Sequence, residues 1–393
     1  MTDAPGGSST TVARPLVILI APDSFKGSLT SVEVARALAA GWSRVRPADT
    51  ILLAPLADGG EGTTIAIEAA GGWTWRAADA TDPIGRAISA RWLQSDDGTR
   101  AFVELAAASG LSRLASDELD PLGATTRGTG ETIVAALDAG VRDVTLGIGG
   151  SATNDGGAGI LRALGARISD SADGAVTVDL AGLDPRLAEM RLRIACDVSN
   201  PLLGAHGAAA TYGPQKGAGP EDVAELDRRL GRYADALELA TARRERDTPG
   251  AGAAGGTGFG LLCLADRLAS LELVPGVDVV MAAADFDGKL ARADIVITGE
   301  GRIDAQTAFG KTALGVARRA AAAAVDCIAV GGGVEPEGIE ALRLLDAVVV
   351  PVVERPQTVG EAMAAGVAPL ERCGERIARL LDLGRRAGAS STP

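Results

Sequence analysis

At the start of the chain, the pattern of hydrophobic and polar positions predicts alternating strands and helices. The apolar run PLVILIAPDSF ends in a polar turn, which predicts a buried parallel strand over residues 16–21. The following segment has helical spacing and opens on Thr30 with Glu33 three positions later, a capping box. A second apolar run, TILLAPLADGGEGT, again leads through a Gly-rich turn toward a helix. The β-α-β-α order is typical of a doubly wound sheet.

The pattern changes from Trp73 onward. The segments WTWRAADA and RAISARWLQSDDGTRAFVELA alternate in polarity and contain Asp97-Gly98, which predicts an antiparallel ribbon. Helices and strands alternate again after it, and PEDVAELDRRLGRYADALELA predicts a long charged amphipathic helix. From ADIVITGEG onward the βα alternation of the first segment returns.

These patterns predict an α/β protein of two domains. The first is a doubly wound parallel domain, Rossmann- or flavodoxin-like, built from residues 14–75 and 290–385. The second, residues 76–289, is an inserted α/β domain with a mixed sheet. Residues 1–13 lack the apolar region of a signal peptide and are predicted to be a disordered leader, and residues 386–393 a flexible tail.

Composition narrows the classes of function. The net charge of −13 and the lack of a basic stripe argue against a nucleic-acid partner. No apolar run reaches the ~18 residues of a membrane span. Four widely spaced cysteines suit reduced thiols, and a single histidine, His206, disfavours histidine-based catalysis. We therefore expect a cytoplasmic monomer or homodimer that binds small molecules and neither nucleic acid nor membrane.

Ligands of such sheets bind outside the carboxyl ends of the strands, so the turns after the strands hold the candidate residues. The first turn brings together Asp23, Ser24 and Lys26, which would suit a carboxylate or phosphate ligand. An ordinary helix-capping turn is the alternative. The second turn places Asp58 and Glu61 around paired glycines, as magnesium ligands or as helix-start acids.

The turn GIGGSATNDGG, residues 147–157, is the candidate anion site of the insertion. Its small residues expose successive N–H groups, and we assign Gly149 and Gly150 to cofactor binding. The turn also matches the loose dinucleotide fingerprint G-x-G-x-x-A, with Asp170 at roughly the expected distance. An NAD(P)-dependent oxidoreductase acting on a small hydroxy acid is therefore the alternative function. Candidate groups for holding a small acid are Ser151, Thr153 and Asn154.

Two more segments of the insertion offer candidate groups. The segment CDVSN places Asp197 at a strand end as a candidate general base. The segment YGPQKGA supplies Lys216, a cation that we assign to substrate binding. The Gly-rich PGAGAAGG contains Gly255 and Gly256, which either approach a nucleotide or serve packing.

The segment ITGEGRIDAQTAFGKTALGVA resembles a P-loop only in part. A P-loop requires glycine where Ala305 stands. The segment instead offers two acids, Glu300 and Asp304, as ligands for a metal. It also offers the cation Lys311, at the start of a helix, as a group that can bind phosphate. We assign nucleotide binding to Gly299, Gly301, Lys311 and Thr312.

Six blocks in this order resemble the bacterial glycerate kinases, the glycerate 2-kinase family, over residues 16–381. They are APDSFKGSLTS, PLADGGEGT, GIGGSATNDGGAG, CDVSNPLLG with YGPQKGA, PGAGAAGG, and the GKT segment. The resemblance implies the two-domain α/β fold and transfer of the γ-phosphoryl group of ATP to D-glycerate with Mg²⁺. It implies 2-phosphoglycerate as the product of most members, with 3-phosphoglycerate less expected. Ala313 stands where the family often has proline.

Phosphoryl transfer relies on positioning and charge neutralisation, and the cations and carboxylates at the strand ends suit this reaction. Lys26, Lys216 and Lys311 are the available cations, and Asp197 or Asp155 is the candidate base. We assign Lys26, Asp197 and Asp155 to catalysis. A sensor that binds a hydroxy acid without turnover is a third possibility, disfavoured by the many carboxylates at strand ends. The expected metal ligands are Glu300, Asp304, Asp58 and Glu61.

Overall fold

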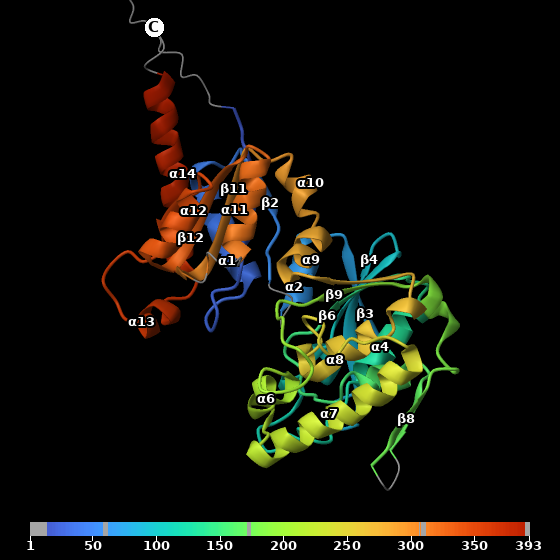
Figure 1. Cartoon of the computed structure of the whole chain (residues 1–393). Coiled ribbons are helices and arrows are strands. Elements are labelled where there is room, and N and C mark those ends of the chain that lie inside the picture. The colour runs from blue at the N-terminus through green and yellow to red at the C-terminus, as the bar shows by residue number, and fades with distance from the viewer. Residues whose placement is uncertain (1–13, 58–61, 171–173, 306, 308–311, 390–393) are drawn as a thin grey trace, which may run out of the picture. The chain divides into compact units, whose positions relative to one another are not determined.

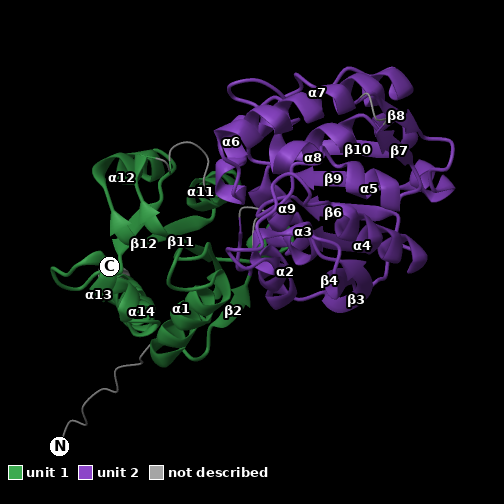
Figure 2. Cartoon of the chain, turned by 90° about the horizontal axis from the view of Figure 1, so that it is seen from below, with its two compact units in different colours: residues 1–53, 287–393 green, residues 54–286 purple. Residues whose placement is uncertain are grey.

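The computed structural model describes residues 14–57, 62–170, 174–305, 307 and 312–389 (Figure 1). The chain divides into two compact units (Figure 2). Unit 1 comprises residues 1–53 and 287–393, and unit 2 the continuous segment 54–286.

Unit 1 is built on a five-stranded parallel sheet with the order β13-β12-β11-β1-β2. Read from β2, the sequential order of these strands is 2-1-3-4-5, the flavodoxin-like arrangement. The predicted doubly wound fold class is therefore confirmed. The strands are β1 (Val17–Pro22), β2 (Thr50–Leu53), β11 (Ile295–Ile303), β12 (Asp326–Val334) and β13 (Val348–Pro351).

Helices cover both faces of this sheet. Ile18 and Ile20 of β1 join a core with α1 (Ser31–Val45) and α14 (Ala368–Ala389) on one face. The alternate residues, such as Leu19, are also fully buried and point to the opposite face. There α11 (Thr312–Ala322) packs on the three central strands. The remaining helices of unit 1 are α10 (Phe286–Leu290), which begins at the junction with unit 2, α12 (Pro336–Arg343) and α13 (Val359–Ala364).

Two glycines allow α1 and α14 to pack at close range. A Cβ at Gly41 would lie 1.8 Å from the carbonyl oxygen of Glu371, and one at Gly374 would lie 2.4 Å from that of Leu38. Side chains at these positions would force the helices apart, so the crossing depends on both. The predicted capping box is also present: Thr30 caps α1 and Glu33 bonds back to it.

Unit 2 contains a six-stranded mixed sheet with the order β10-β9-β6-β5-β4-β3. Strands β3, β4 and β5 are antiparallel, whereas β5, β6, β9 and β10 are parallel. The predicted ribbon is confirmed, with Asp97-Gly98 in the turn between β4 and β5. The strands are β3 (Trp73–Thr81), β4 (Ala87–Ser95), β5 (Arg100–Glu104), β6 (Asp143–Gly147), β9 (Arg191–Ala195) and β10 (Ser270–Val274).

The predicted long charged helix is α7 (Pro220–Thr241) (Figure 1). A separate two-stranded ribbon consists of β7 (Arg167–Asp170) and β8 (Val176–Asp179). The other helices of unit 2 are α2 (Thr63–Ala70), α3 (Ala106–Ser109), α4 (Arg127–Asp138), α5 (Ala158–Ala163), α6 (Ala208–Tyr212), α8 (Ala253–Leu262) and α9 (Gly276–Ala283), with short 3₁₀ turns η1 (Leu111–Arg113), η2 (Pro185–Glu189), η3 (Pro214–Lys216) and η4 (Ala265–Arg267).

The compact units and the proposed domains have different limits. The sequence proposal gave residues 54–75 to the first domain, but α2 contacts β3, β4, β5 and α9 and so packs within unit 2. The proposed tail began at residue 386, whereas α14 continues to Ala389. The proposed leader lies outside the described residues. Among the described helices, none is long and apolar enough to cross a membrane. All four cysteines are unpaired.

Candidate functional site

Asp23 and Glu300 lie side by side in unit 1 at the point where the strand order reverses. β1 and β11 are parallel neighbours with Pro22 opposite Gly299, so Asp23 and Glu300 come next along the two strands. The N–H of Asp23 donates to the carbonyl of Gly299 at 2.8 Å, which continues the ladder. In open α/β sheets this crevice is where ligands bind.

Both carboxylates are buried and both accept a threonine hydroxyl. Asp23 is 8% exposed and Glu300 6% exposed. Thr312, the first residue of α11, donates to Oδ2 of Asp23 at 2.7 Å. Thr307 donates to Oε1 of Glu300 at 2.6 Å. Because buried carboxylates are costly without such partners, the two threonines hold the acids at the sheet edge.

The turn that follows β1 passes close to β11. An ideal Cβ on Gly301 would lie 3.3 Å from Cα of Phe25, so glycine there lets the turn approach. The N–H of Ser24 donates to the Asp23 carboxylate at 2.6 Å. Lys26, next in this turn, is exposed. The turn thus carries an ammonium group on the same loop as the buried Asp23.

The other candidates of unit 1 have different positions. A Cβ on Gly299 would lie 2.5 Å from the carbonyl of Val330, so this glycine allows β11 and β12 to pack closely. The carboxylate of Asp304 lies 3.5 Å from the guanidinium of Arg302. The main-chain N–H of Asp304 donates to Oγ1 of Thr307 at 3.1 Å. The candidates Lys311, Asp58 and Glu61 lie outside the described residues.

The donor set of Asp23 and Glu300 fits Mg²⁺. Magnesium is bound by one or two carboxylates, with water and substrate phosphate oxygens completing its shell. Within the described part of the chain, no group of three or more acidic, histidine or cysteine side chains forms a ready-made cage. Two adjacent carboxylates therefore suit a metal that arrives with a phosphate ligand.

The turn after β6 in unit 2 presents a row of unsatisfied main-chain donors. Among the described residues, no acceptor lies within hydrogen-bonding range of the N–H groups of six residues of this turn. Ser151, Thr153 and Asn154 are buried, Gly149 and Asp155 are half-buried, and Gly150 is exposed. A row of main-chain N–H groups without a protein acceptor is a candidate anion-binding concavity. The six residues are Gly149, Gly150, Ser151, Thr153, Asn154 and Asp155, and we call their N–H groups the amide cradle.

Hydrogen bonds to a neighbouring loop fix the shape of this turn. The N–H of Leu111 donates to the carbonyl of Gly150 at 2.9 Å, and the N–H of Ala152 donates to that of Ser109 at 3.0 Å. Gly150 has φ of 71°, a conformation that favours glycine. The side chains of Ser151, Thr153 and Asn154 are buried. The hydroxyl of Thr153 has no hydrogen-bond partner, a second unsatisfied polar group of this turn.

Lys216 lies beneath this turn in the interior of unit 2. It is 2% exposed, and its Nζ donates to the carbonyl of Thr153 at 2.6 Å. The side-chain oxygen of Asn154 lies 3.5 Å from the same ammonium. Burial lowers the pKa of Lys216 to about 7, and the charge of Asp155 opposes this shift. The side chain therefore supports the turn from the interior.

Asp155 is engaged in anchoring the turn. Its Oδ2 accepts hydrogen bonds from the N–H of Thr126 at 2.8 Å and from the hydroxyl of Thr126 at 2.9 Å. The N–H groups of Gly157 and Gly159 also donate to the carboxylate, at 3.1 and 3.0 Å. The oxygens of Asp155 are therefore occupied by donors of its own turn and of the start of α4, which leaves them poorly placed to contact a substrate hydroxyl group.

Asp197 follows β9, the strand beside β6. The register pairs Gly147 with Ala195, so Gly149 and Asp197 each lie two residues beyond the paired ends. Asp197 is exposed, and its Oδ1 accepts from the N–H of Gly276 at the start of α9 at 2.9 Å. This places an exposed carboxylate and the amide cradle at the same edge of the sheet.

The Gly-rich segment 250–256 packs against both loops. A Cβ on Gly250 would lie 3.2 Å from Sγ of Cys196, and one on Gly255 would lie 1.9 Å from the carbonyl of Thr153. The N–H of Gly156 also donates to the carbonyl of Gly255 at 3.0 Å. Gly255 and Gly256 are buried and have positive φ, 67° and 86°. Their observed contacts are packing contacts within unit 2.

The dinucleotide interpretation of the turn fails on its context. The fingerprint requires an acid at the end of the next strand of the same parallel sheet. Asp170 instead ends β7, which pairs antiparallel with β8 in a separate ribbon. The turn also continues through Asp155 before α5 begins at Ala158.

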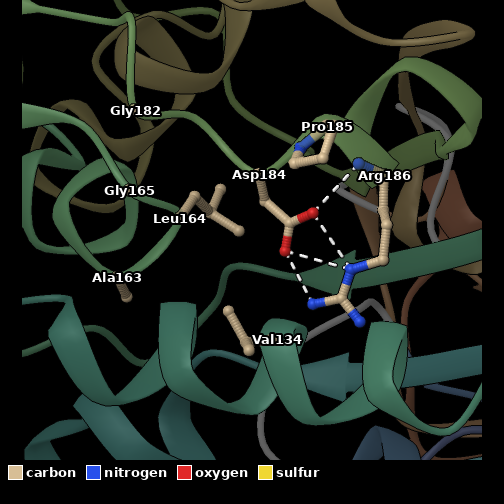
Figure 3. Close-up of a pocket in the computed structure, with 8 residues that line it drawn as sticks. All are labelled: Val134, Ala163, Leu164, Gly165, Gly182, Asp184, Pro185 and Arg186. Atoms are coloured by element: carbon tan, nitrogen blue, oxygen red, sulfur yellow. Dashed lines mark hydrogen bonds and ion pairs between the residues drawn. The ribbon is translucent and has the colours of Figure 1, made fainter.

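A surface hollow elsewhere in unit 2 contains none of the candidate residues (Figure 3). It has a volume of about 450 Å³ and is lined by parts of α4, α5 and η2. Asp184 and Arg186 face each other in it with a 2.6 Å ion pair, and Arg186 also pairs with Asp138 at 2.7 Å. These charges are already satisfied, so we assign the hollow no ligand.

Sequence reasoning missed two residues of these sites. Thr307 holds Glu300, but a threonine between two unremarkable residues gives no sequence signal. Tyr233 of α7 has a buried hydroxyl group without a hydrogen-bond partner in the described chain. Its ring packs against Gly156, where a Cβ would lie 2.8 Å from the ring. Helical spacing alone marks Tyr233 as a core residue of α7.

Comparisons with known proteins agree with these observations. The model of the glycerate kinase family matches residues 18–382. A glycerate 2-kinase of Escherichia coli (strain K12) is 41% identical over 381 residues, covering 94% of this chain and 99% of the relative. A glycerate kinase of Halalkalibacterium halodurans (strain C-125) is 41% identical over 374 residues, covering 92% and 97%.

A solved structure is similar over almost the whole chain. It is the crystal structure of a Salmonella typhimurium LT2 protein assigned as a glycerate kinase 2, with a TM-score of 0.82 and 40% sequence identity. The match covers 95% of this chain and 100% of that structure. Matches of this extent, together with the strand-end carboxylates and the amide cradle, show that this chain belongs to the glycerate kinase family.

Proposed function

We propose that this protein is an ATP-dependent glycerate 2-kinase, which transfers the γ-phosphoryl group of ATP to D-glycerate and yields 2-phosphoglycerate and ADP. The observation that carries the proposal is the family match over residues 18–382, supported by a relative named glycerate 2-kinase at 41% identity. The strand-end groups of both units supply what phosphoryl transfer needs: metal-binding acids, cations, and N–H donors for anions.

In unit 1, we assign Asp23 and Glu300 to Mg²⁺ and Lys26 to phosphate. When bound, Mg²⁺ neutralises phosphate oxygens and orients the transferred group. Thr312 and Thr307 keep the two carboxylates oriented through hydrogen bonds of 2.7 and 2.6 Å. Asp304 remains a candidate metal ligand, as do Asp58 and Glu61.

In unit 2, we assign the amide cradle to the carboxylate of glycerate. Hydrogen bonds from oriented N–H groups to an anion are stronger than those between neutral groups. Asp197 is the proposed general base, which accepts the proton of the 2-hydroxyl group as the oxygen attacks the γ-phosphorus. Its exposed carboxylate at the same sheet edge suits this role better than the fully engaged Asp155.

The direct test is an assay of the purified chain with ATP, D-glycerate and Mg²⁺, coupled to detection of ADP. We expect ADP formation that requires both glycerate and metal, and ³¹P NMR should identify 2-phosphoglycerate. Glycerate binding without ADP formation would favour a sensor and overturn the proposal. Formation of 3-phosphoglycerate would overturn only the proposed regiochemistry.

The same proposal gives the expected setting of the protein. A kinase of this type works where ATP and glycerate are available, so we propose a cytoplasmic location. A monomer or a homodimer remains our prediction, which light scattering after size-exclusion chromatography would decide.

A further inference from the structure

Among the described residues, Lys216 is the most deeply buried cation, and it contacts the turn that carries the amide cradle. Only 2% of it is exposed, and it lies at the end of η3, beneath the turn after β6. Its Nζ donates to the carbonyl of Thr153 at 2.6 Å. A side chain enclosed to this degree is not available for contact with a soluble substrate, so its effect on ligands must pass through the turn.

The geometry of the peptide bond determines what this contact does. Thr153 and Asn154 share one peptide unit, and no described peptide bond is cis. In a planar trans peptide, the C=O and the N–H point in opposite directions. The ammonium that holds the Thr153 carbonyl on one side therefore directs the Asn154 N–H, a member of the amide cradle, to the other side.

Other contacts hold this peptide from the same interior. The carbonyl of Thr153 lies so close to Gly255 that a Cβ there would meet it at 1.9 Å. The side chain of Asn154 is held at both of its polar atoms, with Nδ2 donating to the carbonyl of Pro121 at 3.3 Å and Oδ1 lying 3.5 Å from Lys216. The peptide consequently has little freedom to turn its N–H inward.

When Lys216 is protonated, its charge adds to this orientation of the peptide. A cation bonded to a carbonyl polarises the peptide and strengthens the N–H on its far side as a donor to an anion. The acid that acts electrostatically on Lys216 is Asp155, whose carboxylate is itself held by Thr126, and the buried phenol of Tyr233 on α7 also interacts with Asp155. Burial of an ammonium group costs free energy, and simple packing of the turn does not require a charged side chain there.

We propose that Lys216 is a positioning residue: it orients and polarises the Thr153–Asn154 peptide from inside unit 2, so that the amide cradle binds the carboxylate of glycerate. This inference rests on the proposed function of the cradle. It departs from the sequence expectation that Lys216 itself touches the substrate.

The test compares K216M, which keeps the length and apolar stem of the side chain, with K216R, which keeps charge and donors. We expect K216M to raise the KM for D-glycerate at least tenfold while the KM for ATP changes less than twofold. K216R should recover part of the loss. Lys289→Met is the matched control, because Lys289 donates to the carbonyl of Leu53 in unit 1 and lies outside both proposed sites.

A second measurement does not depend on turnover. Titration of the ¹⁵N-labelled wild-type protein with D-glycerate should shift the backbone amide signals of residues 149–155, and K216M should need at least tenfold more glycerate for the same shifts. Circular dichroism and thermal unfolding establish that each variant is folded. If K216M does not fold, K216R and the wild-type amide titration decide the question.

The outcomes separate the two proposals. Folded K216M with wild-type glycerate affinity would show that Lys216 only packs, and the proposed function would stand. Equal losses of ATP and glycerate affinity would also overturn the positioning role. Absence of ADP formation by the wild type would overturn the proposed function, while the amide titration would still show whether the cradle binds the carboxylate.

Discussion

The hydroxyl of Thr312 donates to the carboxylate of Asp23 at 2.7 Å, across 289 positions of sequence. Asp23 follows the first strand and Thr312 begins α11, so the carboxylate site of unit 1 is assembled from both ends of the chain. The contact ties a candidate metal ligand to the start of a helix that covers the sheet.

We expect Thr312→Val to weaken both stability and metal binding. The variant removes the donor while keeping the shape, which leaves a buried carboxylate short of a partner. A hydrogen bond to a charged group contributes about 1.5–3 kcal/mol, and the free energy of unfolding should fall by this order. Urea unfolding measures the loss, and Thr312→Ser, which keeps the hydroxyl, should recover most of it. Equal losses in both variants would contradict the proposed role of the hydroxyl.

Neutralising the adjacent carboxylates should increase the need for metal. We expect Asp23→Asn and Glu300→Gln each to raise the Mg²⁺ concentration for half-maximal activity at least tenfold, because each removes a negatively charged oxygen ligand. Mg²⁺ titration of the rate measures this. Glu335→Gln is the control, since Glu335 is an acid that pairs with Arg302 at the surface. An unchanged Mg²⁺ requirement in both site variants would remove these acids from the metal site.

Asp197 and Asp155 should respond differently to the same substitution. Asp197→Asn should lower kcat by about 10²–10⁴-fold with little change in stability, as expected for loss of a general base. Asp155→Asn should instead lower the thermal unfolding temperature, because it disturbs the hydrogen bonds with Thr126, Gly157 and Gly159. Steady-state kinetics and thermal unfolding of both variants test the assignment, and the reverse pattern would make Asp155 the base.

The buried ammonium of Lys216 should make stability depend on pH. Its pKa falls from 10.5 to about 7 on folding, so between these values the unfolded chain binds more protons than the folded one. The unfolding free energy of the wild type relative to K216M should therefore rise with pH in this window, by at most about 1.4 kcal/mol per pH unit, and level off below pH 7.

Lysine NMR gives a direct check of that shift. The chain has only four lysines, Lys26, Lys216, Lys289 and Lys311, so a ¹³Cε-lysine spectrum is simple, and K216R identifies the signal of interest. The signal of Lys216 should titrate near pH 7. Titration above pH 10 would show that the side chain is solvated.

Much of the architecture could be predicted from sequence because strand ends have a strong local signal. Apolar runs followed by polar, Gly-rich turns located Asp23, Glu300, Asp197 and the turn after β6. Burial has no such signal: Lys216 has the sequence environment of a surface loop, and only the fold encloses it. The alternation of strands and helices along the sequence assigned residues 54–75 to the first domain. Their place in the compact units instead follows from the packing of α2 on β3, β4 and β5.

The neighbouring positions of β1 and β11 also bear on how the protein matures. During synthesis, residues 54–286 emerge as one continuous stretch, whereas β1 has its neighbour β2 early but must wait for its other neighbour, β11, which begins at Ile295. Because domains fold as units while the chain is made, a nascent polypeptide can complete unit 2 early, while the β1-α1-β2 segment keeps apolar surface exposed until the last quarter of the chain arrives. We expect release of a prematurely ended chain to yield a folded centre attached to an aggregation-prone beginning.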